Sequence, residues 1–314
     1  MAPPNPAAPI ILLANPAAGS GRALARAAIA RESLAAIGVV EFHETRCRGD
    51  ETRIAREAAA RGVRAVVVVG GDGSVSRAAR GLVETGSEVP LAVVAAGTGN
   101  DFAKSLGAPV HDIAAMTERV ARGQIRRVDV GFVDDVPFVN AAGFGFDVHV
   151  LERMEQSMPQ RGRRRVLRGT AAYVVTALRA LVTYGGFRAR HALAHDDVDA
   201  HAPVTSTTRQ LMIVFANGRY FGGAFHIAPA ATLSSGVLHV VSISDASTAR
   251  RLLLFARAIR GAHLSLPEVT NTTATDYRVH FEAPPSFEAD GELHRARGAI
   301  VDVRVQPGAL RVIV

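Results

Sequence analysis

Residues 65–76 read AVVVVGGDGSVS, in which an apolar run ends at three glycines and one carboxylate. The apolar run predicts a buried strand, and the helical pattern that follows it predicts a strand–turn–helix unit. Glycines let a backbone approach a ligand closely, and a helix N-terminus favours an anion. Because Asp72 would repel a phosphate, it implies a divalent metal or a hydroxyl donor beside it. The segment therefore indicates a nucleotide phosphate site, although a tight turn with Asp72 as a helix cap needs the same residues.

Two other turns have the same composition. The apolar residues 10–14 lead into NPAAGSG at 15–21, and the apolar residues 91–94 lead into AGTGND at 96–101. Turns at the carboxyl ends of parallel strands meet at the ligand-binding edge of a sheet. One such turn is a weak signal, but three successive ones predict a shared site. We expect Asp101 to cap the helix that follows the third turn.

The order of the predicted elements changes near residues 126–134. The first part alternates strands (10–14, 39–45, 64–69, 91–95) with helices (23–37, 50–61, 75–84, 111–122). The second part is mostly strands (136–141, 187–195, 210–215, 237–244, 276–282, 300–305), with helices at 168–184 and 247–262. The alternation predicts a doubly wound α/β domain at residues 1–130, and the later strands predict a mainly antiparallel β-sandwich at residues 131–308.

Composition excludes several classes of protein. With 48% hydrophobic and 21% charged residues, the chain of 314 residues has the make-up of a globular protein. No apolar run approaches the roughly 20 residues of a membrane span. The first residues lack the basic region of a signal peptide, so we expect a cytoplasmic protein. The single cysteine, Cys47, excludes an internal disulfide, and the scattered histidines do not have the spacing of zinc ligands.

The chain is basic, with a formal net charge of +7. Tryptophan is absent and aromatic residues make up only 5%, which argues against a nucleic-acid platform. An anionic membrane surface fits better, because the densest basic run, at residues 161–168, precedes an apolar helical pattern at 173–184. We expect peripheral contact with the inner face of the membrane there. A solvated loop before a core helix is the other interpretation.

The three turns, taken together, resemble the signature turns of the diacylglycerol kinase catalytic-domain family, which includes bacterial lipid kinases and the sphingosine and ceramide kinases. The resemblance continues through RVDVG (127–131), FVNAAGFG (138–145), ANGRYFGG (216–223), IAPAA (227–231) and DGE (290–292). It covers nearly the whole chain in the expected order. The family has two domains, and the resemblance implies that the last strand, at 309–314, returns to the first. It also implies a kinase that uses ATP and Mg²⁺ to phosphorylate a lipid hydroxyl, with diacylglycerol as the default acceptor and phosphatidic acid as the product.

The resemblance assigns roles to individual residues. It places the nucleotide at Asn15, Pro16, Gly19, Thr45, Gly70, Gly71, Asp72, Gly73, Ser74, Val75, Gly97, Thr98 and Asn100. Glu292 falls at the position of the catalytic base, with Asp72 and Asp290 as further catalytic acids. Asp72 and Asp129 are the expected ligands of the catalytic Mg²⁺. Without the resemblance, Thr45 is equally a strand-end residue and Asp-Gly-Glu equally a hairpin turn.

Two departures from the family pattern matter. Arg77 stands where relatives often carry an acid, which reverses the charge beside the second turn. The segment around Ser235 has no carboxylate, so we expect a structural Mg²⁺ site there to be weakened or absent. The acceptor is expected in an apolar cleft, and its candidate wall residues are Phe144, Phe146, Phe221 and Phe225, although phenylalanines in strands are more often core.

Two other functions stay open. An NAD kinase shares the Gly-Gly-Asp-Gly turn, but the other two turns and the Asp-Gly-Glu segment favour a lipid kinase. A non-catalytic nucleotide- or lipid-binding regulator is supported only by the departures at Arg77 and Ser235. A homodimer is plausible from the relatives, and the sequence does not name the acceptor lipid.

Overall fold

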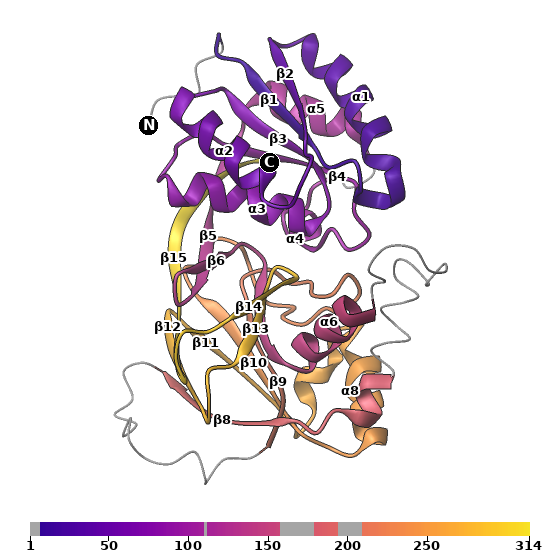
Figure 1. Cartoon of the computed structure of the whole chain (residues 1–314), viewed down its shortest axis with the longest axis vertical. Helices are drawn as coiled ribbons and strands as arrows, with labels where there is room; N and C mark the ends of the chain where they lie inside the picture. The colour runs from indigo at the N-terminus through magenta and orange to yellow at the C-terminus, as the bar shows by residue number, and fades with distance from the viewer. Residues whose placement is uncertain (1–6, 110–111, 158–178, 194–208) are drawn as a thin grey trace. The chain divides into compact units, whose positions relative to one another are not determined.

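The computed structural model describes residues 7–109, 112–157, 179–193 and 209–314, and the chain divides into two compact units (Figure 1). Unit 1 contains Met1–Val130, Thr232–Gly236 and Gln306–Val314. Unit 2 contains Gly131–Ala231 and Val237–Val305. Unit 1 thus includes a short segment, Thr232–Gly236, that the sequence did not point to.

Unit 1 is built on a parallel sheet. Its strands are β1 (Ile10–Ala14), β2 (Val40–Glu44), β3 (Ala65–Gly70) and β4 (Leu91–Ala95), in the order β2-β1-β3-β4. The end of β15 (Ile300–Ile313) joins the sheet beside β4, where Val312 pairs with Leu91. β1, β3 and β4 are buried along their whole length, which is why they read as continuous apolar runs.

Helices connect these strands. They are η1 (Ala18–Gly21), α1 (Arg22–Ala35), α2 (Asp50–Arg61), α3 (Asp72–Glu84), α4 (Asp101–Ser105) and α5 (Ile113–Arg122). The alternation of strand and helix confirms the predicted α/β class. Two boundaries differ from the prediction. α3 begins inside the glycine-rich turn, because the N–H groups of Ser74 and Val75 already donate to Gly71, and the short α4 follows the third turn directly.

Unit 2 is mostly antiparallel sheet, as predicted. Its strands are β6 (Val136–Phe138), β7 (Ala141–Gly145), β8 (Phe187–Leu193), β9 (Arg209–Ala216), β10 (Leu238–Ser244), β11 (Val269–Ala274), β12 (Asp276–Phe281), β13 (Ser286–Ala289) and β14 (Glu292–Arg295), and β5 (Ile125–Val133) leads into it. Its helices are α6 (Phe146–Ser157), α8 (Thr248–Ala258) and η3 (Ala262–Ser265).

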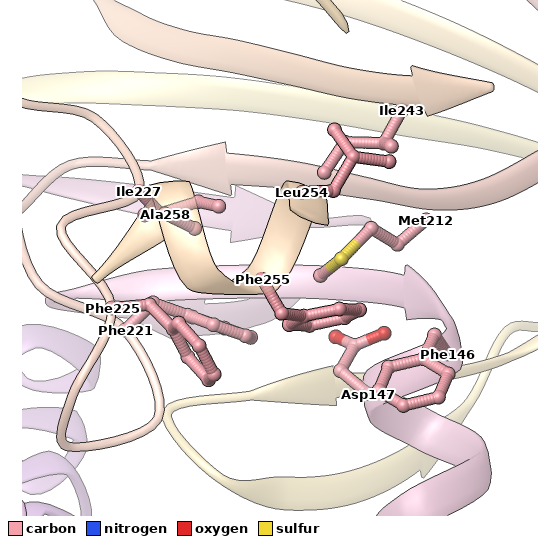
Figure 2. A pocket seen from close by; sticks show the side chains of 10 residues that line it. All are labelled: Phe146, Asp147, Met212, Phe221, Phe225, Ile227, Ile243, Leu254, Phe255 and Ala258. Atoms are coloured by element: carbon pink, nitrogen blue, oxygen red, sulfur yellow. The ribbon is translucent and has the colours of Figure 1, made fainter. Parts of the chain in front are cut away.

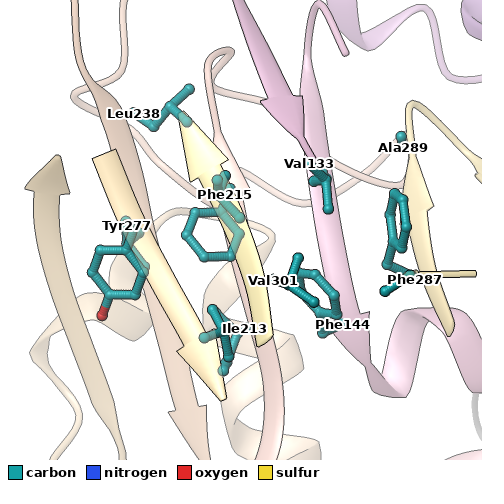
Figure 3. Packing of buried hydrophobic residues seen from close by; sticks show 14 of the residues in the cluster. Val133, Phe144, Ile213, Phe215, Leu238, Tyr277, Phe287, Ala289 and Val301 are labelled. Atoms are coloured by element: carbon teal, nitrogen blue, oxygen red, sulfur yellow. The ribbon is translucent and has the colours of Figure 1, made fainter. Parts of the chain in front are cut away.

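Two apolar cores lie within unit 2. One contains Phe144, Phe215 and Phe287, which pack together with Tyr277 among the strands (Figure 3). The other packs α6 and α8 against the sheet. The sequence analysis predicted no element between residues 141 and 168, so it did not identify α6. The basic run at 161–168 and most of the helix expected at 168–184 lie outside the described residues.

Among the residues that the structure describes, no helix combines the length and the apolar character needed to cross a bilayer.

Candidate functional site

The three glycine-rich turns of unit 1 touch one another. A Cβ on Gly97 would lie 2.4 Å from the Cα of Gly71, so the second and third turns pack backbone against backbone. A Cβ on Gly19 would lie 2.1 Å from the carbonyl oxygen of Ala96, so the first turn rests on the end of β4. Both approaches require glycine. The turns therefore form one surface at the carboxyl ends of β1, β3 and β4, which we call the turn cluster (residues 15–21, 70–76 and 96–101).

Asn15 links the first two turns of the cluster. Its Oδ1 accepts the N–H of Ala17, which closes a local turn. Its Nδ2 donates to Oγ of Ser74 at 3.0 Å and to Oε1 of Glu51 at 3.3 Å. The predicted pair Asn15 and Ser74 is thus brought into direct contact by β1 and the first turn of α3.

Glu51, which the sequence analysis did not identify, is the centre of this network. It lies in the first turn of α2 and is only 1% exposed. Ser74 Oγ donates to its Oε1 at 3.0 Å, and the guanidinium of Arg77 donates to both of its oxygens, at 2.8 and 2.9 Å. A bidentate pair of this kind holds both partners in a fixed orientation.

This network accounts for the departure at Arg77. The acid that relatives often carry on α3 is supplied here from α2, and the arginine pairs with it. Gly81 makes the approach possible, because a Cβ there would lie 2.5 Å from the carbonyl oxygen of Thr52. Gly73 leaves room in turn for the guanidinium of Arg77, which would lie 3.3 Å from its Cβ. Two sequence signals could have pointed to Glu51. Arg77 carries a positive charge where relatives often have an acid, and Gly81 on the same helix allows another element to approach closely.

Asp72 begins α3 and faces the start of α4. Its carboxylate accepts the N–H of Phe102 at 3.2 Å, together with those of Asn100 and Asp101. Burial, and next the negative charge of Asp101, raise the pKa of Asp72 to about 6. The expectation that Asp101 caps α4 is wrong: Asp101 lies inside the helix and pairs with Lys104 at 3.4 Å, and Asp72 supplies the capping oxygen.

The remaining predicted nucleotide residues lie around the same edge. Thr45 follows β2, is buried, and donates its N–H to the carbonyl of Ala14. Thr98 is exposed at the tip of the third turn. Asn100 has a left-handed backbone (φ 54°), and its side chain both accepts from and donates to the backbone of Gly97.

Two arginines from α1 reach the turn cluster and were not predicted. Arg22 Nε donates to the carbonyl of Gly19 at 3.0 Å, and Arg26 donates to the carbonyl of Ala95. Their guanidinium groups bring positive charge to the first turn and to the end of β4, and the dipole of α3 also favours an anion at its N-terminal end. The cluster is therefore suited to bind phosphates.

Asp129 is placed differently from the prediction that it holds Mg²⁺. It is buried at 2% exposure, and its two oxygens accept the N–H groups of Gly308, at 2.8 Å, and Gly236, at 2.6 Å. Its own N–H donates to Leu233. These contacts join three separate segments of unit 1 and favour a structural role. Within the described ranges, no three Asp, Glu, His or Cys side chains gather as metal ligands would.

The Asp-Gly-Glu segment forms a two-residue hairpin turn between β13 and β14. Asp290 and Gly291 both have positive φ, 50° and 82°, which is typical of a type I′ turn. The carboxylate of Asp290 accepts the N–H groups of three consecutive residues, Val139 to Ala141, at 2.8 to 3.1 Å. Glu292, the first residue of β14, is partly exposed. Asp290 therefore fixes the turn, and these contacts favour a positioning role for it over a catalytic one.

Unit 2 also contains an apolar pocket with one carboxylate directed into it (Figure 2). Its lining residues are Phe146, Asp147, Met212, Phe221, Phe225, Ile227, Ile243, Leu254, Phe255 and Ala258. Three of the four predicted wall residues are among them, whereas Phe144 packs in the core. The cavity itself is small, at about 30 Å³.

Asp147 is the unusual residue of the pocket. It is 4% exposed, and no side chain in the described part of the chain donates a hydrogen bond to its carboxylate. Its carboxylate lies between the rings of Phe146 and Phe255 (Figure 2). Burial raises the pKa of Asp147 far above its ordinary value. Gly143 makes room for it, since a Cβ there would lie 1.8 Å from Asp147 Oδ2 and 3.2 Å from Glu288 Oε1.

Glu288 connects the pocket to the hairpin turn. Its Oε2 accepts the N–H of Gly291 at 2.7 Å, while Oε1 lies near Asp147 on the other side. The carboxylates of Asp147 and Glu288 thus both face Gly143.

Comparisons with known proteins agree with this arrangement. Residues 9–133 match the model of the diacylglycerol kinase catalytic domain, and residues 141–314 match that of the YegS C-terminal NAD kinase beta sandwich-like domain. A diacylglycerol kinase of Mycobacterium tuberculosis (strain ATCC 25618 / H37Rv) is 31% identical over 313 residues, which cover 97% of this chain and 94% of the relative. One from Bacillus subtilis (strain 168) is 27% identical, over 80% of this chain and 78% of the relative.

A solved structure has the same fold. The crystal structure of a diacylglycerol kinase from Bacillus anthracis str. Sterne aligns with a TM-score of 0.71 at 20% identity, covering 97% of this chain and 96% of that one.

Proposed function

The chain belongs to the diacylglycerol kinase catalytic domain family, with a YegS-type C-terminal domain, and on that premise we propose that it transfers the γ-phosphate of ATP to a lipid hydroxyl, with diacylglycerol as the acceptor and phosphatidic acid as the product. The observation that carries the proposal is the meeting of the three glycine-rich turns in unit 1. Phosphoryl transfer depends chiefly on the positioning and charge stabilisation of phosphates, and this cluster provides groups for both.

The turn cluster is the proposed nucleotide site. The N-terminal end of α3 and the cations of Arg22 and Arg26 would face the phosphates. Asn15 and Ser74 are held by Glu51, so their polar atoms need no reorganisation when a nucleotide binds. Such fixed groups stabilise a charged transition state better than mobile ones.

Asp72 is the residue that fits a magnesium ion. Its carboxylate lies beside the acid of Asp101, and a dication in this position would be bound by one or two carboxylates together with phosphate oxygens. Bound there, Mg²⁺ would supply neutralisation of phosphate charge. Asp129 fits this role less well, because it is only 2% exposed and both of its oxygens accept backbone N–H groups, whereas Asp72 is partly exposed.

The pocket of unit 2 is the proposed acceptor site. Its walls are apolar, as an acyl chain requires, and Asp147 offers a polar group for a hydroxyl. Because the cavity is small, a chain would enter by rotation of flexible side chains such as Met212.

Glu292 is the proposed general base. The turn that carries it is fixed on one side by Asp290 and on the other by Glu288, which defines where Glu292 leaves the hairpin. A carboxylate in this role would accept the proton of the lipid hydroxyl as the new phosphate ester bond forms.

The test is transfer of γ-labelled phosphate from ATP in mixed micelles, with a panel of lipids and NAD as acceptors. We expect labelled phosphatidic acid from diacylglycerol. Glu292→Gln should lower the rate by about 10²- to 10⁴-fold, the usual contribution of a general base. Glu118→Gln is the matched control, because Glu118 is exposed on α5 and pairs only with Arg122 in the described residues.

Three results would change the assignment. Labelled NADP would make the chain an NAD kinase. Binding of ATP without any labelled acceptor would favour the regulator. An unchanged rate in Glu292→Gln would remove the base from the mechanism and leave the kinase activity standing.

A further inference from the structure

Helix α8 exposes an apolar face. Every exposed residue from Ala249 to Arg260 is apolar or arginine, and together they form what we call the outer face of α8: Ala249, Leu252, Leu253, Ala256, Arg257, Ile259 and Arg260. Leu252 is 46%, Leu253 36% and Ile259 56% exposed. Neighbouring exposed apolar side chains of this size mark interaction surfaces more often than bare surface.

The opposite side of the same helix is also apolar. Leu254, Phe255 and Ala258 line the pocket of unit 2, and Leu254 is 2% exposed. The helix also carries Thr248 and three arginines, so it is not apolar all round, but Leu252 and Leu253 are exposed outside its buried side. Exposed leucines gathered in this way mark the outer face of α8 as a candidate interaction surface.

The charge of this surface is positive. Its only charged residues are Arg257 and Arg260, and it has no carboxylate. The two acids nearest in sequence are already paired: Asp245 with Arg251, at 2.5 Å, and Glu268 with Arg250, at 2.6 Å. A partner with negative charge and an apolar interior would complement the face.

We propose that the outer face of α8 docks on a lipid bilayer with anionic headgroups. Leucine and isoleucine beside arginine are typical of helices that lie in the membrane interface. A second copy of this chain would bring the same positive charge to the contact, whereas anionic headgroups bring the complementary charge. The inference rests on the proposed function in one respect: a docked α8 would place the wall of the acceptor pocket at the lipid surface. It differs from the basic run at 161–168, which lies outside the described residues.

The absence of tryptophan from the chain allows a direct test. Leu253→Trp introduces a single fluorophore on the outer face of α8, and Ile29→Trp, at a 53% exposed site on α1, is the matched control. With vesicles of phosphatidylcholine and phosphatidylglycerol, the indole emission of the Leu253→Trp variant should shift to the blue, and that of the Ile29→Trp variant should not. With pure phosphatidylcholine, the shift of the Leu253→Trp variant should weaken strongly.

Flotation of the full chain with the same vesicles measures binding itself. Leu252→Glu with Leu253→Glu should lower vesicle binding at least tenfold, and Ile29→Glu should leave it unchanged. Arg257→Glu with Arg260→Glu should lower binding by about fivefold for each arginine that is replaced. None of these residues lines the pocket, so transfer to a short-chain monomeric diacylglycerol should not change.

The docking proposal is overturned if the Leu252/Leu253 variant floats like the native chain, or if the native chain does not float. It is also overturned if the emission of the Leu253→Trp variant is already blue-shifted without vesicles and depends on protein concentration, because that outcome assigns the face to a second copy. Flotation needs neither ATP nor catalysis, so failure of the kinase assay would leave this result readable on its own.

Discussion

The turn cluster of unit 1 is made of backbone, whereas the pocket of unit 2 is made of side chains. In the cluster, Gly19, Gly71 and Gly97 bring main chain into contact with main chain, and a single added Cβ would clash. In the pocket, ten side chains between Phe146 and Ala258 surround a small space. The first arrangement is rigid and suits a ligand of fixed shape, such as a chain of phosphates. The second can adapt, which suits a flexible acyl chain.

The strongest way to break the rigid region is to remove its buried acid. Glu51→Ala removes the carboxylate that the guanidinium of Arg77 pairs with and that accepts from Ser74 and Asn15. We expect unit 1 to lose about 3–5 kcal/mol of stability, the usual cost of removing one member of a buried ion pair. Urea unfolding measures it. Arg53→Ala, which breaks only exposed pairs with Asp50 and Glu57, should change stability by less than about 1 kcal/mol.

Glu51→Gln separates charge from hydrogen bonding. It can still accept from Ser74, so it should keep the turns in place better than Glu51→Ala while weakening the contact with Arg77. If Glu51→Ala were as stable as the native chain, the network around Glu51 would not hold the cluster.

The turn cluster could be predicted well from the sequence and the pocket of unit 2 only poorly, and the difference has a physical reason. A backbone site needs particular residue types at fixed spacing, and GGDG (70–73) and GTGN (97–100) display them locally. The alternation of apolar runs with helical patterns likewise predicted the parallel sheet. A pocket of ordinary apolar residues leaves no such pattern, because Met212 or Leu254 reads the same in a core.

Long-range pairing explains the other misses. Glu51 reaches the site from a helix that the motifs do not include, and only the tertiary structure shows its pairing with Arg77. The capping of α4 by Asp72, 30 residues away, replaced the local cap predicted for Asp101. The sequence predicted Asp129 as a Mg²⁺ ligand and Asp290 as a catalytic acid, whereas in the structure both accept backbone N–H groups, which no side-chain pattern reports.

Two glycine substitutions in the first turn separate the effect of a steric clash from that of backbone strain, and their expected effect on stability is smaller than that of Glu51→Ala. Gly19 has φ 59° and no room for a Cβ, whereas Gly21 has φ 91° and nothing within 4 Å of a Cβ. We expect Gly19→Ala to cost about 2–3 kcal/mol and Gly21→Ala about 1 kcal/mol, because only the first adds a clash to the strain. Thermal unfolding and ATP binding by calorimetry should rank them in this order, with ATP affinity about tenfold weaker in Gly19→Ala. Equal effects would mean that the first turn does not rest on β4.

Replacing Asp72, the acid of the turn cluster, should change stability by a smaller amount and should stabilise the protein rather than destabilise it. Because the pKa of Asp72 is raised to about 6, the folded state holds a proton that the unfolded state releases above about pH 4. Stability therefore falls as pH rises from about 4 to 6, and the loss persists at higher pH. Asp72→Asn removes this pH-dependent loss, because asparagine does not ionise. The variant should therefore be about 1–2 kcal/mol more stable than the native chain at pH 8 and equal to it near pH 4.

The same variant should be nearly inactive, at about 10²- to 10³-fold lower transfer, which is the pattern of a residue kept for function at the expense of stability. Asp112→Asn is the control, since asparagine replaces aspartate well at the exposed cap of α5 and should change stability by no more than a few tenths of a kcal/mol at either pH. A loss of stability at pH 8 in Asp72→Asn would show that its capping contact outweighs the cost of its burial.

The smallest expected effect on stability belongs to a substitution in the pocket of unit 2. It tests whether the pocket can adapt to its ligand, in contrast to the rigid turn cluster. Phe225 is partly exposed at the pocket wall, so Phe225→Leu should cost less than about 1.5 kcal/mol while lengthening the space available to a chain. We expect the preferred acyl length of diacylglycerol to increase and the KM for ATP to stay the same. Phe42→Leu, at a similarly half-buried ring on β2, should leave the acyl preference unchanged. If Phe225→Leu altered the KM for ATP and not the acyl preference, the division of labour between a rigid nucleotide site and an adaptable acceptor pocket would be wrong.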